Sequence, residues 1–260
     1  MNITSNNNER EAPGAHPLSG KVVLVTGGSR GIGAAIARRF ASVGSRVAIG
    51  CRSRSAAADA VLADIAAAGT EGIVVAGDIA DPAAARAMVA QAVAKFGHID
   101  VLVNCAGISE HRPFEASDAA FFHAIFDINV LGTVAMIQAA LPHLTAPGGR
   151  IINFSSGLAT RPIPKTSIYA ASKAAVAALS HALAKEFGPR GITVNTIAPG
   201  VIETEMTTTI LQERGESILA MTPLGRIGQP DDISGIALFL ASPDAGWLTG
   251  RTLIADGGMS

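Results

Sequence analysis

The 260-residue sequence predicts an α/β fold, a single-domain doubly wound parallel sheet of about seven strands with helices on both faces. Short apolar runs alternate with longer helix-like stretches, which implies right-handed strand–helix–strand crossovers and one parallel sheet. Hydrophobic residues make up 48% of the chain and 28 residues are glycine, as expected for a buried sheet covered by closely packed helices. No linker, repeat or low-complexity segment interrupts the alternation after residue 17. We therefore expect a flexible tail at residues 1–17 and one folded domain at residues 18–260.

Each strand is predicted from a continuous apolar run bounded by polar residues or glycine. In chain order these runs are Val22–Thr26, Arg46–Cys51, Ile73–Ala76, Val101–Asn104, Arg150–Ser155, Thr193–Ile197 and Thr252–Ala255. The helices expected between them are Ile32–Ser42, Ala56–Ala67, Pro82–Phe96, Phe121–His143, Tyr169–Phe187 and Asp231–Leu240. Pro82 and Pro230 mark helix starts, because the first helical residue needs no N–H donor.

Composition excludes several classes of function. The formal net charge of −1 shows no basic excess, so we expect no nucleic acid partner. The chain has no apolar run that we expect to span a bilayer, and residues 1–17 lack the apolar core of a signal peptide. The two cysteines, Cys51 and Cys105, end strand-like runs and do not suggest a disulfide framework, which favours a cytoplasmic location. The six histidines have no metal-ligand spacing, so no metal site is expected.

The first predicted strand runs directly into a glycine-rich turn. The turn, Gly27–Gly33, follows Thr26 and leads into the helix-like stretch Ala34–Phe40. Glycines let the backbone turn tightly and approach a pyrophosphate, while a helix N-terminus supplies free N–H groups and a partial positive charge. The order of strand, turn and helix therefore indicates a dinucleotide site. The alternative is a glycine turn that only closes the connection.

A second motif points to acid–base chemistry. Ser156 follows the fifth predicted strand, and thirteen residues later Tyr169 and Lys173 stand four positions apart. Positions four apart share one face of a helix, so both side chains can point into one cleft. A nearby ammonium favours the phenolate, and we expect it to lower the pKa of Tyr169 from about 10 towards the working pH. Taken alone, this spacing also fits an ordinary amphipathic helix.

Taken together, these residues resemble the short-chain dehydrogenase/reductase family over about Leu18 to Ser260. The matching motifs, in the family's order, are Thr26–Gly33, Asp78, Asn104–Gly107, Asn129, Ser156, Tyr169 with Lys173, and Pro199–Gly200 leading to Thr204. The resemblance implies a Rossmann-type fold and an oxidoreductase that interconverts a ketone and a secondary alcohol. Within the family the pattern looks most like the β-ketoacyl-thioester reductases, with relatives that act on sugars, steroids and small ketones.

The resemblance also implies the roles of the catalytic residues. Tyr169 would protonate the carbonyl oxygen, Ser156 would hydrogen-bond that oxygen, and Lys173 would lower the pKa of Tyr169 and hold ribose hydroxyls. Asn129 would support a proton relay to Lys173, although an Asn within a helix could also only bend it or cap a neighbour. Ser155 could compete with Ser156, but the thirteen-residue spacing favours Ser156.

The expected cofactor is NADP(H). Where the NAD-dependent members carry an acidic residue this chain has Cys51, followed by Arg52, and Arg30 lies in the glycine turn. A guanidinium can clamp a 2′-phosphate, although these arginines could also be solvated surface charges. The full set of expected cofactor contacts is Gly27, Ser29, Arg30, Gly31, Ile32, Gly33, Arg52, Ser53, Asp78, Ile79, Asn104, Ala106, Gly107, Tyr169, Lys173, Pro199, Gly200, Ile202 and Thr204.

The sequence limits the substrate only to a small-molecule carbonyl or alcohol. The expected pocket is moderately apolar and comprises Ile108, His111, Phe114, Leu158, Thr160, Arg161 and Ile163. The segment 205–222 is either a lid over the substrate or a plain surface helix. Basic residues that would receive an acyl carrier protein are missing from Thr145–Gly149, with only Arg150 and Arg190 nearby. A non-catalytic NADP-binding regulator is the alternative of another class, and the resemblance implies a homotetramer.

Overall fold

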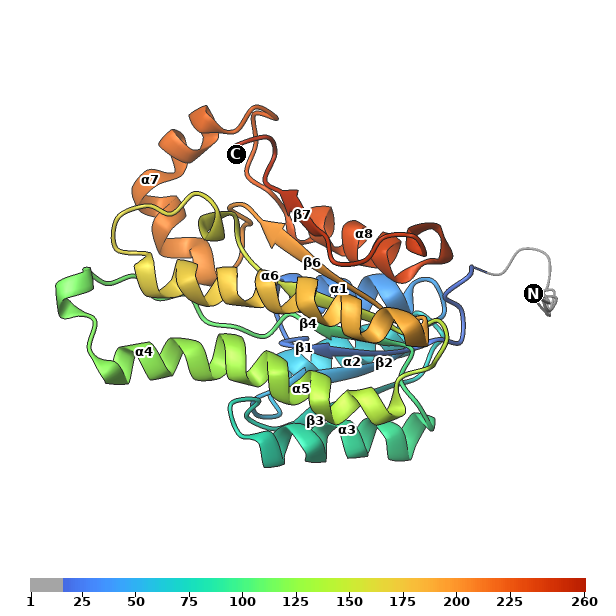
Figure 1. Ribbon diagram of the computed structural model, residues 1–260. Coiled ribbons are helices and arrows are strands. Elements are labelled where there is room, and N and C mark those ends of the chain that lie inside the picture. Colours follow the sequence, from blue (N-terminus) through green and yellow to red (C-terminus); the bar gives the residue numbers. More distant parts are fainter. Residues whose placement is uncertain (1–15) are drawn as a thin grey trace.

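The computed structural model describes residues 16–260, so residues 1–15 of the expected tail lie outside the described part. All seven strands pair in parallel in one sheet, in the order β3-β2-β1-β4-β5-β6-β7 (Figure 1). The strands are β1 Val22–Thr26, β2 Arg46–Cys51, β3 Gly72–Ala76, β4 Val101–Asn104, β5 Arg150–Phe154, β6 Thr193–Pro199 and β7 Thr252–Ala255. The Rossmann-type doubly wound sheet expected from the sequence is confirmed. Four strands have the expected bounds, and the other three differ by one or two residues at one end.

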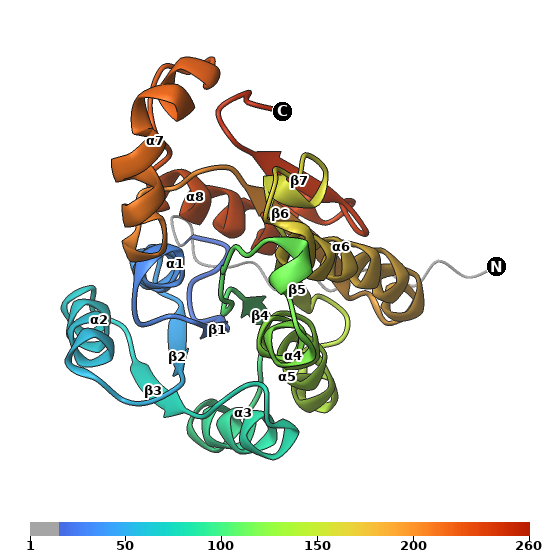
Figure 2. The same ribbon diagram turned by 90° about the vertical axis from the view of Figure 1, so that its left-hand side faces the viewer.

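Helices cover both faces of the sheet (Figure 2). They are α1 Gly31–Ala41, α2 Ala56–Ala67, α3 Pro82–Phe96, α4 Ala119–Phe126, α5 Gly132–Ala140, α6 Ser167–Phe187, α7 Thr208–Met221 and α8 Pro230–Ala241. One core cluster packs α1, α2 and α8 against one face of the sheet. A second cluster packs α3, α5 and the end of α6 against the other. Because all seven strands run in parallel, their carboxyl ends lie at one edge of the sheet. Ligands bind at this edge in such sheets.

The expected helix Phe121–His143 is interrupted. α4 passes into a π-helical turn, Asp127–Leu131, before α5 begins, and a 3₁₀ turn, Leu141–His143, follows α5. The expectation that no run could span a bilayer is also wrong by length and composition. The continuous helical stretch Ala119–His143 has 25 residues, and its most apolar window has a mean hydropathy of 1.7. Its α5 part packs into the core beside α3, so it serves here as a core helix.

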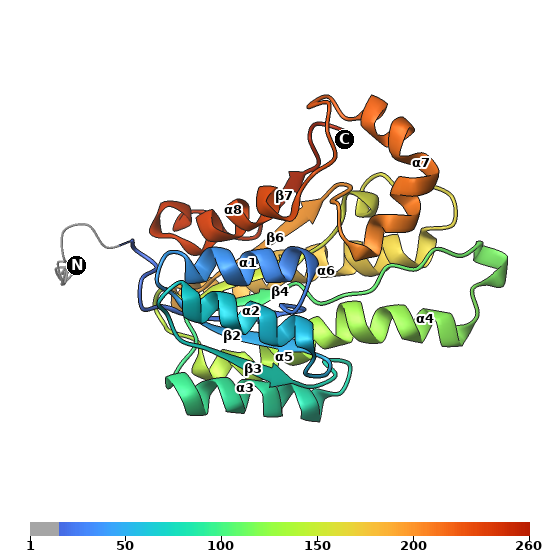
Figure 3. The same cartoon turned by 180° about the vertical axis from the view of Figure 1, so that it is seen from behind.

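The segment after β6 extends over the carboxyl edge of the sheet (Figure 3). A 3₁₀ turn, Glu205–Thr207, leads into α7, which stands apart from the two helical layers. Only Ile218 of α7 is buried, whereas Met206, Leu219 and Met221 are exposed. α7 is therefore weakly anchored to the rest of the protein.

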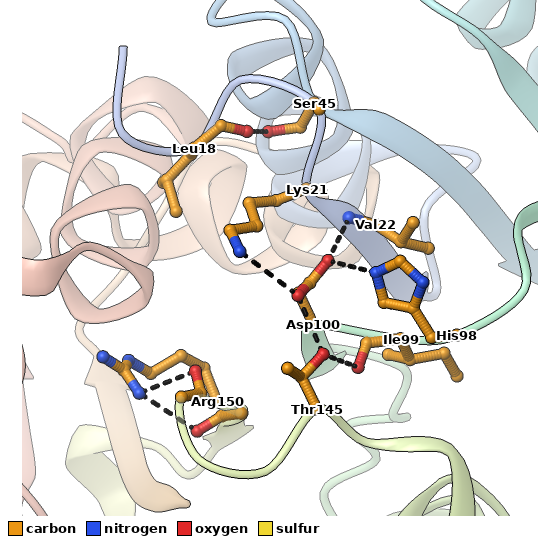
Figure 4. Close-up of polar contacts among 12 residues, drawn as sticks. Leu18, Lys21, Val22, Ser45, His98, Ile99, Asp100, Thr145 and Arg150 are labelled. Carbon is orange, nitrogen blue, oxygen red and sulfur yellow. Dashed lines mark hydrogen bonds and ion pairs between the residues drawn. The ribbon is translucent and has the colours of Figure 1, made fainter. Parts of the chain in front are cut away.

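At the opposite edge of the sheet, the buried carboxylate of Asp100 joins several chain segments through polar contacts (Figure 4). Oδ2 of Asp100 accepts hydrogen bonds from the backbone N–H of Val22, at 2.8 Å, and from Nε2 of His98, at 2.9 Å. Oδ1 accepts a bond of 2.8 Å from Oγ1 of Thr145 and lies 3.6 Å from Nζ of Lys21. Asp100 thus ties the start of β1 to the segments that precede β4 and β5.

Replacing Asp100 by Asn is expected to lower the free energy of unfolding at pH 7 by about 2–3 kcal/mol, because donors aimed at a carboxylate lose their acceptor. Burial raises the pKa of Asp100, but the bonds from Val22 and Thr145 and the charges of Lys21 and His98 outweigh it, so the pKa is lowered overall. The stabilisation is therefore complete above the unfolded pKa of about 3.9 and is lost as pH falls through the lower folded pKa.

Urea unfolding of the parent and the Asn variant between pH 7 and pH 3 measures this difference. Asp244→Asn is the matched control, because Asp244 is exposed at the surface. A difference at Asp100 that stays constant over this pH range, or that equals the effect at Asp244, would contradict the assigned role.

Candidate active site

The turn after β1 contains glycines whose replacement would bring side chains into the surrounding backbone. Gly27 has a φ of 67°, and a Cβ there would lie 2.9 Å from Cα of Ala106 in the turn after β4. A Cβ at Gly33 would collide with the carbonyl oxygen of Gly27. The turn is therefore a backbone cradle that requires glycine. α1 begins at Gly31 without a side-chain cap from Arg30, so its first N–H groups can face an anion.

The segment after β6 lies beside this cradle. A Cβ at Gly31 would lie 3.3 Å from Cγ2 of Thr204. Next to it, Nη1 of Arg30 lies 2.8 Å from Oε2 of Glu205. Ser29 and Ile32 flank Arg30 and Gly31 in the same turn and are partly exposed. Two segments far apart in the sequence therefore lie side by side at the carboxyl edge.

The residues that end β6 are more enclosed. Pro199 is the last residue of the strand, and its carbonyl oxygen would lie 3.5 Å from a Cβ at Gly157. A Cβ at Gly200 would lie 2.6 Å from Cβ of Asp256. Ile202 is buried. These residues consequently offer backbone groups rather than side chains to a ligand.

The two arginines expected to clamp a phosphate each lie beside an acid. Nε of Arg52 lies 3.6 Å from Oδ2 of Asp78, and Ser53 is exposed next to it. Oδ1 of Asp78 accepts a bond of 3.0 Å from the N–H of Ala80, so Asp78 also stabilises its own turn. Ile79 is buried against α5. Exposed ion pairs contribute only about 0–1 kcal/mol, so an incoming phosphate can displace them.

The turn after β4 brings small residues against the catalytic candidates. The N–H of Ala106 donates to Oγ1 of Thr26 at 3.1 Å. A Cβ at Gly107 would lie 2.9 Å from Oδ1 of Asn129 and 3.1 Å from Nζ of Lys173. The side chain of Asn104 is buried and donates to Oδ1 of Asn153 at 2.8 Å. Asn104 can therefore meet a cofactor only through its backbone.

Asn129 lies within the π-helical turn, and its side chain holds the chain at Ile108. Its Oδ1 accepts from the Ile108 N–H at 2.9 Å, and its Nδ2 donates to the Ile108 carbonyl oxygen at 3.0 Å. Nδ2 also donates to Oγ of Ser172 at 3.1 Å. The amide therefore links the turn after β4 to α6.

The two neighbouring serines at the end of β5 point to different places. Oγ of Ser155 is buried and donates to the carbonyl oxygen of Lys173 at 2.8 Å. Oγ of Ser156 accepts from the N–H of Leu158 at 3.2 Å, and its hydroxyl is one of two that act to lower the pKa of Tyr169. Of these two serines, Ser156 is the one that influences the pKa of the phenol, and its catalytic role stays a prediction from the thirteen-residue spacing.

The expected lowering of the Tyr169 pKa by Lys173 is wrong for the protein alone. Burial raises the pKa of Tyr169, and hydrogen bonds with the Ser156 and Ser109 hydroxyls offset only part of the increase. Burial also lowers the pKa of Lys173 to about 8, and its Nζ donates to the carbonyl oxygen of Phe154 at 3.1 Å. The spacing gave no information on burial, which dominates both pKa values.

The sequence pattern missed Ser109, whose hydroxyl acts to lower the pKa of Tyr169; Ser109 lies in a loop and has no helical or strand periodicity to mark it. The pocket residues expected from the sequence are also divided. Phe114 and Ile163 line a pocket of about 480 Å³ along Ala170, Ala171 and Ala174 of α6. This part of α6 is distinct from the side that carries Tyr169. Arg161 donates to the carbonyl oxygen of Met259 near the C-terminus.

Comparisons with known proteins identify this arrangement. A family model described as enoyl-(acyl carrier protein) reductase matches residues 27–260. A 3-oxoacyl-[acyl-carrier-protein] reductase of Staphylococcus aureus is 39% identical over 92% of this chain and 98% of its own length. The chain belongs to the short-chain dehydrogenase/reductase family. It is therefore an oxidoreductase that acts on CH–OH groups, as the sequence predicted.

Other relatives within the family are named for different activities. An uncharacterized oxidoreductase of Methylorubrum extorquens is 45% identical, over 93% of this chain and 98% of that protein. A 2,5-dichloro-2,5-cyclohexadiene-1,4-diol dehydrogenase of Sphingobium indicum is 40% identical, over 95% of this chain and 98% of that protein. The crystal structure of a short-chain dehydrogenase from Burkholderia cenocepacia in complex with NADP has a TM-score of 0.89 at 39% identity, covering 94% of this chain and 99% of that one. Family membership therefore does not select one substrate.

Proposed function

We propose that the protein is an NADP(H)-dependent oxidoreductase that interconverts a ketone and a secondary alcohol, with Asn129, Ser156, Tyr169 and Lys173 as its catalytic residues. The observation that carries this proposal is that the side chains of Asn129 and the buried Lys173 meet at Gly107 in the turn after β4. Lys173 lies on α6, the helix that also carries the buried Tyr169. The glycine cradle fits a dinucleotide, because a side chain at Gly27 or Gly33 would strike backbone. When bound, the nicotinamide supplies or accepts a hydride.

In the reductive direction, Tyr169 donates its phenolic proton to the carbonyl oxygen of the substrate. Ser156 donates a hydrogen bond to the same oxygen and stabilises the negative charge that develops there. Lys173 would hold the ribose hydroxyls of the cofactor, and its positive charge would favour the phenolate that Tyr169 becomes. Asn129 fixes the backbone at Ile108 and so keeps the wall of the site in place. The oxidative direction uses the same groups in reverse order.

The preference for NADP(H) over NAD(H) is supported by Arg30 and Arg52, which flank the predicted position of the 2′-phosphate. The related Burkholderia cenocepacia dehydrogenase binds NADP in its crystal structure. Replacing Arg52 by Ala is expected to raise the Kd of NADPH about 10- to 100-fold, since a hydrogen bond to a charged group contributes roughly 1.5–3 kcal/mol. The Kd of NADH should change less than about threefold, because NADH carries no phosphate at this position.

Fluorescence titration of both cofactors measures these constants. Arg54→Ala is the matched control, because Arg54 lies two positions away and its Nη2 pairs with Asp59 at 2.7 Å. An Arg52→Ala variant that binds NADPH and NADH in the parent's ratio would rule out the phosphate contact.

We further propose that residues 205–222 close over the substrate as a lid. This proposal is supported by the position of α7 at the carboxyl edge and by the exposed apolar residues of this segment.

A homotetramer is proposed from family resemblance, with support from Trp247 and Ile254, which are exposed near the edge strand β7. Light scattering measures the number of subunits directly.

A cytoplasmic location is proposed because Cys51 and Cys105 are free cysteines, which a reducing compartment maintains.

A small ketone is favoured over a thioester carried by acyl carrier protein, although reduction of a 3-oxoacyl thioester is kept as a test. Arg150 and Arg190, the basic residues nearest the stretch before β5, both donate to backbone carbonyls of their own chain. They are therefore poorly placed to bind an acidic carrier. Oxidation of NADPH and NADH with acetoacetyl thioester and with a panel of ketones, diketones and sugars tests the proposal. No turnover with any carbonyl compound would contradict it.

A further inference from the structure

A chain of buried side-chain hydrogen bonds runs from the end of β4 to α6. Nδ2 of Asn104 donates to Oδ1 of Asn153 at 2.8 Å, and Nδ2 of Asn153 donates to Oγ of Ser180 at 2.8 Å. Oγ of Ser180 in turn donates to the carbonyl oxygen of Val176 at 2.8 Å. All three polar side chains are buried. Asn153 therefore links the end of β4 to the helix that carries Tyr169.

The polar side chains of this chain lie in one row across the sheet. Asn104 and Asn153 are register partners in β4 and β5, and Thr196 of β6 is the next partner in the row. Oδ1 of Asn104 and Oγ1 of Thr196 are buried without a hydrogen-bond partner among the residues that the structure describes. Two residues earlier, the same two strands pair Leu102 with Ile151, and both are buried. Because unpaired buried polar atoms cost free energy, the polar row is better explained by what it connects than by stability.

α6 is attached to β5 at a second point. Ser155 continues the strand, because its N–H donates to the carbonyl oxygen of Ile197 at 2.8 Å. It lies two positions after Asn153, on the same face, and its Oγ donates to the carbonyl oxygen of Lys173 at 2.8 Å. Lys173 and Ser180 are about two helical turns apart on one face of α6. A helix held at one point can pivot, whereas two points fix its tilt.

Lys173 lies between Tyr169 and Ser180 along α6, so the helix can act as a lever. With a rise of ~1.5 Å per residue, Tyr169 is about 6 Å and Ser180 about 10 Å from Lys173 along the axis. If the helix shifts by about 1 Å at Ser180 and pivots at Lys173, Tyr169 moves by roughly 0.6 Å in the other direction. A misplacement of about 1 Å can lower a rate about 10²-fold. The bond at Ser180 is therefore able to affect the reaction from a distance.

We propose that Asn153 is a positioning residue, whose amide holds α6 at Ser180 and thereby sets where Tyr169 and Lys173 stand beside the turn after β4. A primary amide suits this position, because its oxygen accepts from Asn104 while its nitrogen donates to Ser180. A carboxylate offers no donor, and an aliphatic side chain offers neither group. This inference rests on the proposed function, which makes Tyr169 and Lys173 catalytic residues.

The test compares Asn153→Ala with Asn195→Ala, a matched control in β6. Asn195 is also fully buried, and its amide also makes two hydrogen bonds, to the carbonyl oxygen of Leu248 at 2.8 Å and from the N–H of Arg251 at 3.1 Å. These bonds hold the segment before β7. Both variants should therefore unfold at a lower urea concentration than the parent, because each leaves buried groups unpaired.

Only Asn153→Ala should lower kcat, about tenfold, with NADPH and the panel ketone that the parent reduces fastest. The Kd of NADPH should change less than about threefold, because the glycine turn and Arg52 are untouched. Ser180→Ala removes only the acceptor on α6 and should lower kcat by about three- to tenfold. The double variant should lose less than about twofold more than Asn153→Ala, because both replacements break the same bond. Losses that multiply would contradict the inference.

The tyrosinate absorbance of Tyr169, the only tyrosine in the chain, gives a readout that needs no substrate. Burial raises the pKa of Tyr169 in the parent. A displaced α6 admits water to the phenol, so the pKa should fall towards about 10 in Asn153→Ala and Ser180→Ala but not in Asn195→Ala.

Equal changes in kcat and in the pKa of Tyr169 in Asn153→Ala and Asn195→Ala, or no change in either variant, would show that the inference is wrong while the ketone–alcohol activity stands. If the parent reduces no ketone, the proposed activity fails. The tyrosinate titration then decides by itself whether Asn153 sets the position of Tyr169.

Discussion

Replacing Tyr169 by Phe is expected to lower kcat for a ketone about 10²- to 10⁴-fold, the range typical of general acid catalysis. The variant keeps the aromatic ring in its buried position but removes the proton that the carbonyl oxygen must receive. Ser156 remains and can hydrogen-bond the oxygen, but its hydroxyl is too weak an acid to replace the phenol. The Kd of NADPH should stay within about threefold, because the glycine cradle and Lys173 are intact.

Tyr169 is the only tyrosine in the chain, so the ultraviolet absorbance of tyrosinate reports its pKa without interference. In the protein alone the pKa should lie above its usual value of about 10, because burial raises it. With NADP⁺ added, the pKa should fall, because the positive nicotinamide ring and a repositioned Lys173 favour the phenolate. Full activity of Tyr169→Phe, or a pKa that ignores the cofactor, would contradict the assigned role.

Replacing Lys173 by Met is expected to abolish most activity and at the same time to stabilise the fold. The ammonium is buried, and desolvation lowers the pKa of Lys173 from 10.5 to about 8. At pH 7 the protein therefore holds a charge that would be better solvated in the unfolded chain. Removing it should raise the free energy of unfolding by about 1–3 kcal/mol, since each pKa unit corresponds to ~1.4 kcal/mol and the bond to Phe154 is lost.

The stability difference between Lys173→Met and the parent should depend on pH. Because the folded pKa lies below the unfolded one, the penalty is complete below about pH 8 and fades as pH rises towards 10.5. The stability gap between variant and parent should therefore close over that range in urea unfolding. Lys185→Met on the same helix is the control, because Lys185 is exposed. A Lys173→Met variant less stable than the parent at pH 7 would contradict the account.

The sequence predicted the sheet and its helices well because their signals are local. Apolar runs such as Val22–Thr26 and helix starts such as Pro82 depend on neighbouring residues only. The π-helical turn at Asn129 carries no such signal, since it depends on bonds to Ile108, 21 positions away in the chain. Side-chain spacing therefore predicts where a helix lies more readily than where it deviates.

In the candidate site, too, local signals were predictable from the sequence, whereas contacts between distant residues were not. The spacing of Ser156, Tyr169 and Lys173 is a local signal, and it was enough to predict a shared cleft for them; that cleft stays a prediction. The ion pair between Arg30 and Glu205 was not predictable, because it joins residues 175 positions apart. The direction of the Tyr169 pKa was also beyond sequence reasoning, because it is set by burial.

The central claim is that this site transfers a hydride between NADP(H) and the carbon of a carbonyl group. The most direct measurement uses NADPH with deuterium at both C4 positions, a ketone substrate, and mass spectrometry and NMR of the product alcohol. We predict one deuterium, bound to the carbinol carbon. Deuterium at any other carbon, as reduction of a carbon–carbon double bond would give, or NADPH oxidation without deuterium in the product, would contradict it.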